Sequence, residues 1–331
     1  MDGQNTDDDD DDGLVFAFDL DGQGGGRPLS WAELDDPELT FALPWIHLHL
    51  DSERACRWLR EESGMDGAIV DAILDGDTRP RCVEHEAGLL AILRGVNLNP
   101  GEIAEDMVAL RIWLEKAAIV TTRRRTLQSI RVLAEDVRAG RGPKSPGDFL
   151  VRLSAALGNR IEPIVDILDE ELELAEENFA ENKRQAYAGQ FSQLRRRAAK
   201  LRRYLGPQRE AYQAISRHGT GLLNSEQAFE IQEDGDRVTR LLEDLDLVRE
   251  RAMVAQEELL GRMAQQQNDR MYILAIVSAI FLPLAFLSGL FGMNVAGLPG
   301  TQDPLGFVYT MLGMFAAAVG IGVLFRWKGW L

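Results

Sequence analysis

The chain has 331 residues, and its 53 acidic side chains outnumber its 36 basic ones, which gives a formal net charge of −17 at pH 7. This charge argues against nucleic acid as a partner, because binding to phosphates needs a basic face. The sequence contains no phosphate-binding Gly-Lys-Ser/Thr loop, no nucleophile elbow and no metalloprotease helix motif, so it does not predict an enzyme.

The first part of the chain predicts an α/β domain. Residues 1–12 are expected to form a disordered acidic tail, since positions 7–12 are six consecutive aspartates. Residues 13–223 are expected to form a domain of mixed strands and helices followed by long helices. Strands are predicted at 14–20, 41–50, 81–85, 89–96, 107–113 and 118–122, and helices at 56–62, 66–74 and 126–139. The Gly- and Pro-rich segment 140–147 is predicted to be a linker.

Two later helical segments carry opposite charges. Carboxylates dominate residues 166–181, and Arg and Lys dominate residues 193–203. One interpretation is an antiparallel helix pair with facing charges. In the other, the field of the acidic helix concentrates cations near the entrance of a pore.

Residues 224–270 are predicted to form a stalk helix. Its apolar side chains recur in alternating steps of three and four, at Val238, Leu241, Leu245, Val248, Ala252, Ala255 and Leu259. This heptad seam needs a partner surface, either within the chain or on further copies of it. No proline lies between positions 224 and 282, so the helix can continue into the next segment for roughly 100 Å.

Two apolar segments, 271–294 and 306–326, predict transmembrane helices. Residues 271–291 and 306–325 contain no Asp, Glu, His, Lys or Arg, and about 20 such residues span a bilayer core. The loop 295–305 has no Lys or Arg, whereas basic residues flank the spans on their other sides: Arg262, Arg270, Arg326 and Lys328. The positive-inside rule therefore places both termini, including the tail 327–331, in the cytoplasm. Trp327 and Trp330 fit an interfacial anchor on that side.

The residues around the first span resemble those of a known family. The tripeptide Gly292-Met293-Asn294 ends the span, Phe281-Leu282-Pro283 lies near its middle, and Asn268 precedes it. In these motifs and in its domain order, the chain resembles the CorA-type divalent-cation transporters of the inner (plasma) membrane. The segment 107–125 and the loop that follows Asn294 resemble the ZntB-like, zinc-transporting branch. Asp303 is the only charge in that loop, where many magnesium-transporting relatives carry an acidic motif.

The resemblance implies a funnel-shaped homopentamer of α/β/α cytoplasmic domains, in which five copies of the first span line a pore through membrane lipid. A ring of Asn294 side chains would offer carbonyl oxygens to a hydrated cation. Helical spacing back from Asn294, at the mouth of the pore, predicts the lining residues Ala285, Leu282, Ser278, Leu274, Met271 and Asn268. Rings of Met271 and Leu274 would gate the pore by dewetting.

The function implied by the resemblance is zinc uptake, which some members of the branch couple to protons. No resident cofactor is expected; the divalent cation is cargo, zinc first, with magnesium, cobalt, nickel and cadmium as alternatives. Two other classes stay open, a gated magnesium, cobalt or nickel channel and a membrane-tethered cation sensor.

Few side chains of the cytoplasmic part are typical zinc ligands. His47 and His49 share one face of a predicted strand, and Cys82 and His85 form a Cys-x-x-His pair. Zinc sites usually need three or four ligands, and residues three apart on a strand point to opposite faces. A disulfide between Cys56 and Cys82 is not expected in a reducing compartment.

Overall fold

The computed structural model describes residues 12–180, 187–218, 221–293 and 303–329. It divides the chain into two compact units, residues 1–256 and 257–331, so the division falls inside the predicted stalk helix. Of the predicted acidic tail, only Asp12 is described. Its carboxylate lies 3.3 Å from Nη1 of Arg54.

A seven-stranded mixed sheet forms the first part of unit one. The strands are β1 (Leu14–Leu20), β2 (Gly26–Pro28), β3 (Pro44–His49), β4 (Arg81–His85), β5 (Gly88–Gly95), β6 (Val108–Leu114) and β7 (Ile119–Arg123). Their order across the sheet is β2-β1-β3-β7-β6-β5-β4. Every neighbouring pair is antiparallel except β3 and β7, which run parallel with Trp45 opposite Ile119.

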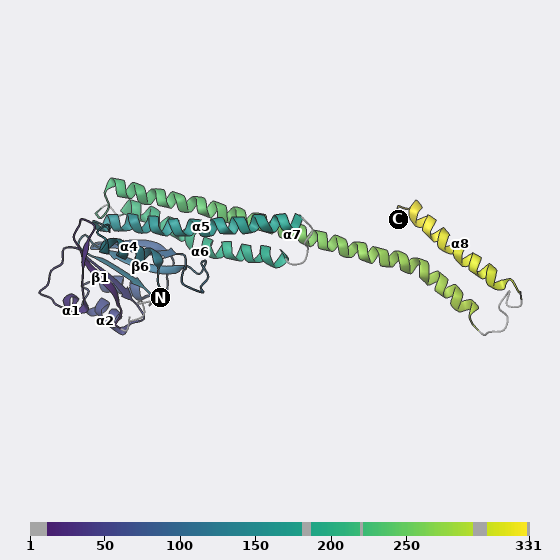
Figure 1. Ribbon diagram of the computed structural model, residues 1–331, viewed down its shortest axis with the longest axis horizontal. Coiled ribbons are helices and arrows are strands. Elements are labelled where there is room, and N and C mark those ends of the chain that lie inside the picture. The colour runs from purple at the N-terminus through teal and green to yellow at the C-terminus, as the bar shows by residue number, and fades with distance from the viewer. Residues whose placement is uncertain (1–11, 181–186, 219–220, 294–302, 330–331) are drawn as a thin grey trace, which may run out of the picture. The chain divides into compact units, whose positions relative to one another are not determined.

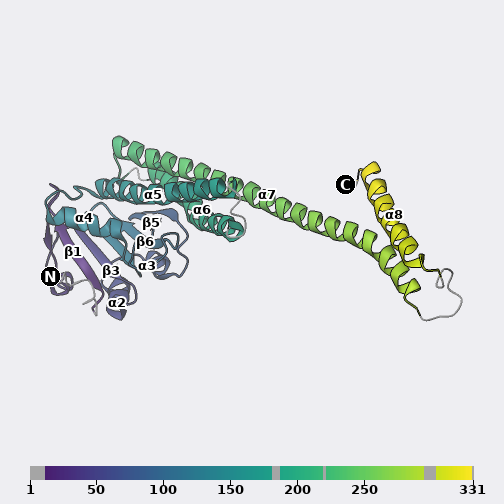
Figure 2. The ribbon, with the colours of Figure 1, turned by 45° about the vertical axis from the view of Figure 1, so that its right-hand side comes forward.

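Helices cover both faces of the sheet, which confirms the predicted α/β/α layering (Figure 2). On one face, α2 (Glu53–Glu61) and α3 (Gly67–Leu74) bury Trp58 and Ile69 in a core that includes Leu48 of β3. The opposite face packs against α4 (Gln128–Arg138) and the long helices α5 (Pro146–Ala180) and α6 (Tyr187–His218). There the ring of Trp45 meets Phe149 of α5 edge to face, with centroids 5.1 Å apart.

The structure differs from the sequence prediction between residues 21 and 50 and again at 140–147. The strand β2 and the short helix α1 (Trp31–Leu34) were not predicted, because three or four residues show no measurable periodicity. The strand expected at 41–50 begins only at Pro44. The predicted linker is a packed turn: the amide of Gly142 donates to the carbonyl of Gly24 at 2.6 Å, and Gly142 and Pro143 are buried.

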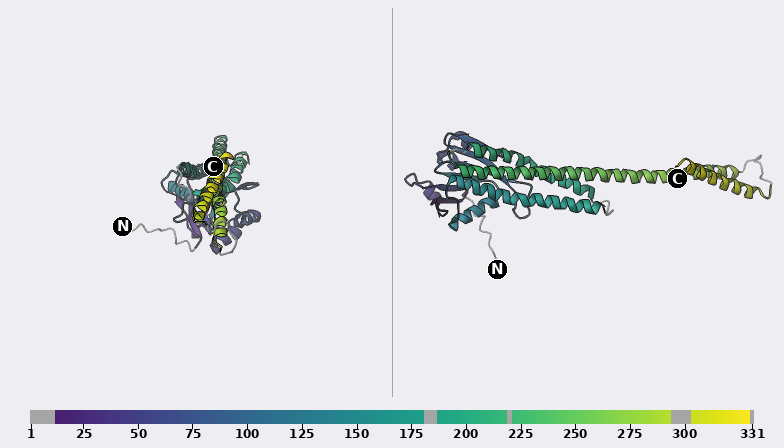
Figure 3. Two further views of the ribbon diagram at one scale, coloured as in Figure 1. Left: turned by 90° about the vertical axis from the view of Figure 1, so that its right-hand side faces the viewer. Right: turned by 90° about the horizontal axis from the view of Figure 1, so that it is seen from above.

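The helices α5 and α6 run side by side with the first part of α7 (Ser225–Phe291) (Figure 1; Figure 3, right). The acidic and basic segments predicted from sequence lie in α5 and α6, and Arg197 of α6 pairs with Glu171 of α5. The pairing is less exclusive than predicted. Arg251 of α7 also pairs with the acidic segment, and Arg197 binds Glu105 as well.

The heptad seam of α7 is satisfied within one chain. Its members in unit one are all buried, with at most 7% of any side chain exposed: Val238, Leu241, Leu245, Val248, Ala252 and Ala255. Hydrogen bonds and ion pairs on either side of the seam join α7 to α5 and α6. Arg237 donates to Asn159 of α5 at 2.8 Å, and Arg202 of α6 lies 2.7 Å from Asp246. The spacing left two possible partners for the seam, another part of the same chain or a further copy of it. In the structure the seam packs within the same chain.

Unit two contains the end of α7 and the helix α8 (Gly306–Trp327). The stalk and the first span are one uninterrupted helix of 67 residues that contains Pro283. Both α7 and α8 are long and apolar enough to cross a membrane. The mixed α/β domain, the long helix and the apolar C-terminal helix therefore follow the predicted architecture.

Candidate functional site

The first span has two distinct faces. Its partly buried side chains form one stripe with helical spacing, at Ile276, Ile280, Leu284 and Leu287. A matching stripe on α8 consists of Gly306, Thr310, Met314, Ala317, Ala318, Ile321, Gly322 and Phe325. Leu287 of the first stripe and Gly306, Thr310 and Met314 of the second line one cavity, so the two stripes face each other at this end of the spans. In the part of the chain that the structure describes, the other side chains of the first span are exposed.

The residues predicted to line a pore all lie on the uncovered part of the helix. Asn268, Ser278 and Ala285 are exposed. The apolar members are exposed by 63% at Met271, 66% at Leu274 and 71% at Leu282. From Met271 to Ala285 they succeed one another at three- and four-residue steps, on the side of the helix away from the Ile280 stripe. One continuous face therefore remains free to meet something other than α8.

The signature tripeptide is described in part, because Asn294 lies outside the described residues. The span ends at Phe291, and the amide of Gly292 still donates to the carbonyl of Ser288 at 2.9 Å. A Cβ added at Gly292 would lie 3.0 Å from that same carbonyl oxygen. The position thus favours glycine because the backbone is close, and Met293 beyond it is half exposed.

Asp303, the only charge of the loop 295–305, acts at the start of α8. Its Oδ1 accepts from the amide of Leu305 at 2.9 Å, and its carbonyl accepts from the amide of Gly306 at 3.0 Å. Asp303 and Gly292 both line a cavity of about 900 Å³ between the ends of the two spans, together with Phe291 and Phe307. The sequence did not predict this proximity.

Both spans expose many large apolar side chains, and so much exposed apolar surface is unfavourable in water. Phe281 and Phe286 of α7 are more than three-fifths exposed, and Phe307 and Phe315 of α8 are 77% and 70% exposed. At the end of α8, Trp327 is 83% exposed. A continuous apolar surface of this kind belongs in lipid or against further protein.

The candidate zinc ligands of the sheet are engaged elsewhere. Nδ1 of the buried His47 lies 2.8 Å from the hydroxyl of Thr121, and Nε2 of His49 lies 3.0 Å from the carbonyl of Arg124. Burial raises the pKa of the Cys82 thiol to about 12, so it stays protonated at neutral pH. Within the described ranges, no three His, Cys, Asp or Glu residues are placed to hold a metal ion.

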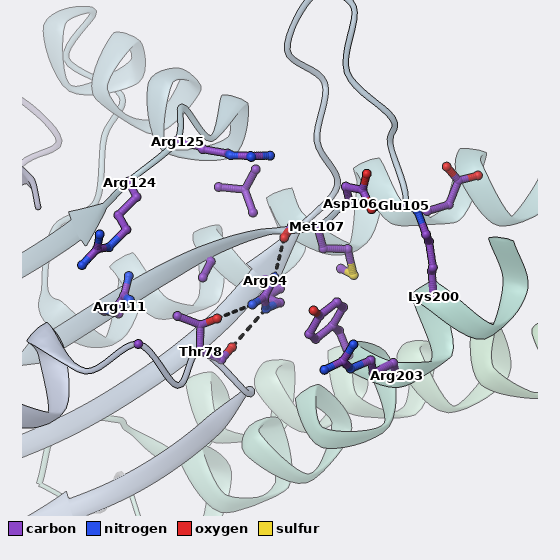
Figure 4. A pocket seen from close by; sticks show the side chains of 14 residues that line it. Thr78, Arg94, Glu105, Asp106, Met107, Arg111, Arg124, Arg125, Lys200 and Arg203 are labelled. Atoms are coloured by element: carbon purple, nitrogen blue, oxygen red, sulfur yellow. Dashed lines mark hydrogen bonds and ion pairs between the residues drawn. The ribbon is translucent and has the colours of Figure 1, made fainter. Parts of the chain in front are cut away.

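A second feature of unit one was missed from sequence. A cavity between α6 and the β5–β6 part of the sheet has a lining in which cationic side chains, including Arg94, Arg111 and Arg203, outnumber acidic ones (Figure 4). Local signals existed in the basic segment 193–203 and in the run of arginines at 123–125. Neither signal shows that these residues converge.

Comparison with known proteins agrees with this architecture. Residues 42–327 match the family model described as CorA-like Mg2+ transporter protein. The chain is 36% identical over 325 residues to the divalent cation transporter CmaX of Pseudomonas aeruginosa, covering 96% of this chain and 97% of the relative. It is 31% identical over 319 residues to the zinc transport protein ZntB of Pectobacterium atrosepticum, covering 96% of each. The structure of full-length CmaX matches with a TM-score of 0.84, covering 96% of this chain and 98% of that one.

The two exposed apolar helices and these similarities define the class of the protein, a membrane transporter of divalent cations. The chain belongs to the CorA-like Mg2+ transporter family. This confirms the family resemblance noted from the residues of the first span.

Proposed function

We propose that the chain carries zinc into the cell through a pore that is lined by the first span of a homopentamer in the inner membrane. Both termini then lie in the cytoplasm, as the basic residues flanking the spans predict. The proposal extends the established class, divalent-cation transport, to a particular ion, assembly and orientation.

The observation that carries the proposal is the uncovered face of α7. Two helices of one chain cannot enclose a pore, so a pore requires several copies. The stripe that contains Ile280 and Leu287 is the less exposed side of the span, and Leu287 lines a cavity together with residues of α8. The opposite face, with Met271, Ser278 and Leu282, is therefore available for a shared axis. A ring of such faces accounts for the exposed side chains of the first span, and α8 then lies outside it.

The chemistry of this face suits a hydrated cation. Ser278 and Asn268 supply neutral oxygens, and a ring of Asn294 side chains would meet the ion at the outer mouth. Divalent ions release water reluctantly, so weak contacts with the hydration shell permit passage where tight ligands would trap the ion. Rings of Leu274 and Met271 would close the pathway by excluding water.

Zinc is supported by the similarity to ZntB of Pectobacterium atrosepticum and by an outer loop whose only charge is Asp303. A proton gradient that drives uptake would have to act through groups outside the apolar spans, since 271–291 and 306–325 contain no acidic or basic side chain. The same absence favours the second candidate, a gated magnesium, cobalt or nickel channel, which the description of the matching family also supports.

Flux into liposomes tests the proposal. Purified protein is reconstituted, and zinc entry is followed with a trapped fluorescent reporter, with and without an inward proton gradient. Asn294→Ala is compared with Tyr309→Phe, a conservative change on the exposed side of α8. We expect gradient-enhanced zinc uptake that Asn294→Ala abolishes and Tyr309→Phe leaves unchanged.

Other outcomes separate the candidates. Gradient-independent uptake that magnesium blocks would replace the zinc proposal with the channel. No flux of either ion from a folded, correctly inserted protein would contradict both and favour a membrane-tethered sensor.

A further inference from the structure

The cationic cavity belongs to unit one alone. It has a volume of about 580 Å³ and opens between α6, the ends of β5 and β6, and the segments before β4 and after β7. Figure 4 shows Arg94 near its centre, with Arg111 and Arg124 on one side and Lys200 and Arg203 on the α6 side. A cavity of this size holds a small molecule.

The lining carries an excess of positive charge in a protein whose overall charge is strongly negative. Six cationic side chains line the cavity, Arg94, Arg111, Arg124, Arg125, Lys200 and Arg203, against two acidic ones, Glu105 and Asp106. Both acids already have partners. Glu105 is 2% exposed and pairs with Arg197 outside the lining, and Asp106 lies 2.9 Å from Nζ of Lys200.

Two of the other cations have acidic partners as well. Nη1 of Arg124 lies 3.0 Å from Asp51, and Nη1 of Arg125 lies 3.6 Å from Glu102. The three that remain are Arg94, Arg111 and Arg203. In the described part of the chain, no carboxylate forms an ion pair with any of these three guanidinium groups.

The contacts that these three arginines do make are with neutral groups. Arg94 donates to the carbonyls of Thr78 and Met107 and to the hydroxyl of Thr78. Nη2 of Arg111 donates to the carbonyl of Asp75 at 3.1 Å. Arg203 lies over the ring of Tyr204, 5.4 Å from its centroid. None of these contacts neutralises a charge.

Arg111 supplies an independent sign that the cavity suits an anion. Its side chain is only 1% exposed, yet its Nε has no hydrogen-bond partner. Burial, together with the charges of Arg124 and Arg94, lowers the pKa of Arg111 to about 10. A buried donor without an acceptor, held among like charges, is costly unless an anion compensates it.

We propose that this cavity binds a small polyphosphate anion, such as pyrophosphate or a nucleoside di- or triphosphate. Three guanidinium groups without carboxylate partners match several negative charges, and the planar guanidinium fork suits phosphate oxygens. Arg94 and Arg111 lie on neighbouring strands and on the same face of the sheet, because Arg94 is opposite Ala109 and Arg111 opposite Ile92. Arg203 reaches the same cavity from α6.

The test uses the full-length protein in detergent, without divalent cations and at physiological ionic strength. Pyrophosphate, ATP and citrate are titrated separately by calorimetry into the wild type, Arg203→Ala and Arg196→Ala. Arg203 is exposed on α6, so its removal leaves the core intact. Arg196 is the matched control, an exposed arginine of the same helix whose contacts are with Ser192.

We expect pyrophosphate or ATP to bind the wild type and Arg196→Ala with equal affinity, and Arg203→Ala about tenfold more weakly. Tighter binding of ATP than of pyrophosphate would identify a nucleotide, and the reverse an inorganic polyphosphate. No binding of either at millimolar concentration, or equal weakening by both substitutions, would overturn the proposal. Citrate binding as tight as pyrophosphate would also overturn it, because the site would then suit carboxylates, including those of a second copy.

Discussion

Nη1 of Arg251 on α7 lies 2.8 Å from Oδ1 of Asp169 on α5. Nη2 of the same guanidinium lies 2.6 Å from Glu176, about two turns further along α5. Arg251 therefore ties the helix that continues into the membrane span to the acidic segment of the domain.

Replacing Arg251 with Met is expected to lower the free energy of unfolding by about 1 kcal/mol, the upper range for partly exposed ion pairs, because two pairs are lost. Urea unfolding of the full-length protein, followed by tryptophan fluorescence, measures this. Arg249→Met is the control, since Arg249 pairs within its own helix with Asp246. Equal losses in the two variants would show that the link to α5 contributes nothing.

The seam of α7 predicts a larger effect. Leu245 is fully buried, so Leu245→Ala is expected to cost about 2–5 kcal/mol of unfolding free energy. Leu247 is 52% exposed on the same helix, and Leu247→Ala should change stability by less than about 0.5 kcal/mol. The same urea unfolding distinguishes them. If the seam instead joined copies of the chain, Leu245→Ala would change the oligomeric mass and leave the fold of each chain stable.

The two faces of the first span predict different accessibility to water. In a background with Cys56 and Cys82 replaced by Ala, Ser278→Cys should react with a membrane-impermeant, charged thiol reagent, and the reaction should reduce cation flux. Ile280→Cys, on the stripe toward α8, should stay unmodified. Labelling is read by mass spectrometry of protein in liposomes. Modification of Ile280→Cys alone would place the pore on the other face.

Stability should depend on pH through His47. Burial lowers the pKa of His47 well below its ordinary value of 6.5, and the charge of Arg123 adds to this, so the native ring stays neutral. Below about pH 6.5, His47 of the unfolded chain takes up a proton, whereas the native ring stays neutral. Proton uptake therefore stabilises the unfolded state relative to the native state and lowers the free energy of unfolding. The His47 contribution is therefore complete above pH 6.5 and is lost as pH falls, by up to about 1.4 kcal/mol per unit.

His47→Gln removes this dependence. Urea unfolding at several pH values between about 5 and 7 should give a shallower pH slope for the variant than for the wild type, whatever its absolute stability. Identical slopes would mean that His47 titrates alike in the native and unfolded states. Because the test compares slopes, the other titrating groups cancel.

Sequence patterns predicted the sheet well where strands are long and buried. The strands β5 to β7 were expected within one or two residues of their ends, because largely apolar runs mark buried strands. The strand at 81–85 was also predicted, although it is a partly exposed strand at the edge of the sheet. The sequence patterns did not predict β2 and α1, because these elements are too short to show a hydrophobic periodicity. They also gave the wrong prediction at 140–147, where glycine and proline indicated a linker. The contact between Gly142 and Gly24 that packs this turn joins residues far apart in the chain.

The sequence by itself determined the two spans and the unbroken helix that leads into the first of them. These are local properties: twenty uncharged apolar residues have no stable place in water, and a helix continues where no proline removes a backbone donor. Only the tertiary structure decided which partner the heptad seam uses, which face of the first span is the more exposed, and that Arg94, Arg111 and Arg203 line one cavity. Such relationships depend on strand register and on helix packing between segments far apart in the chain, so local sequence patterns do not predict them.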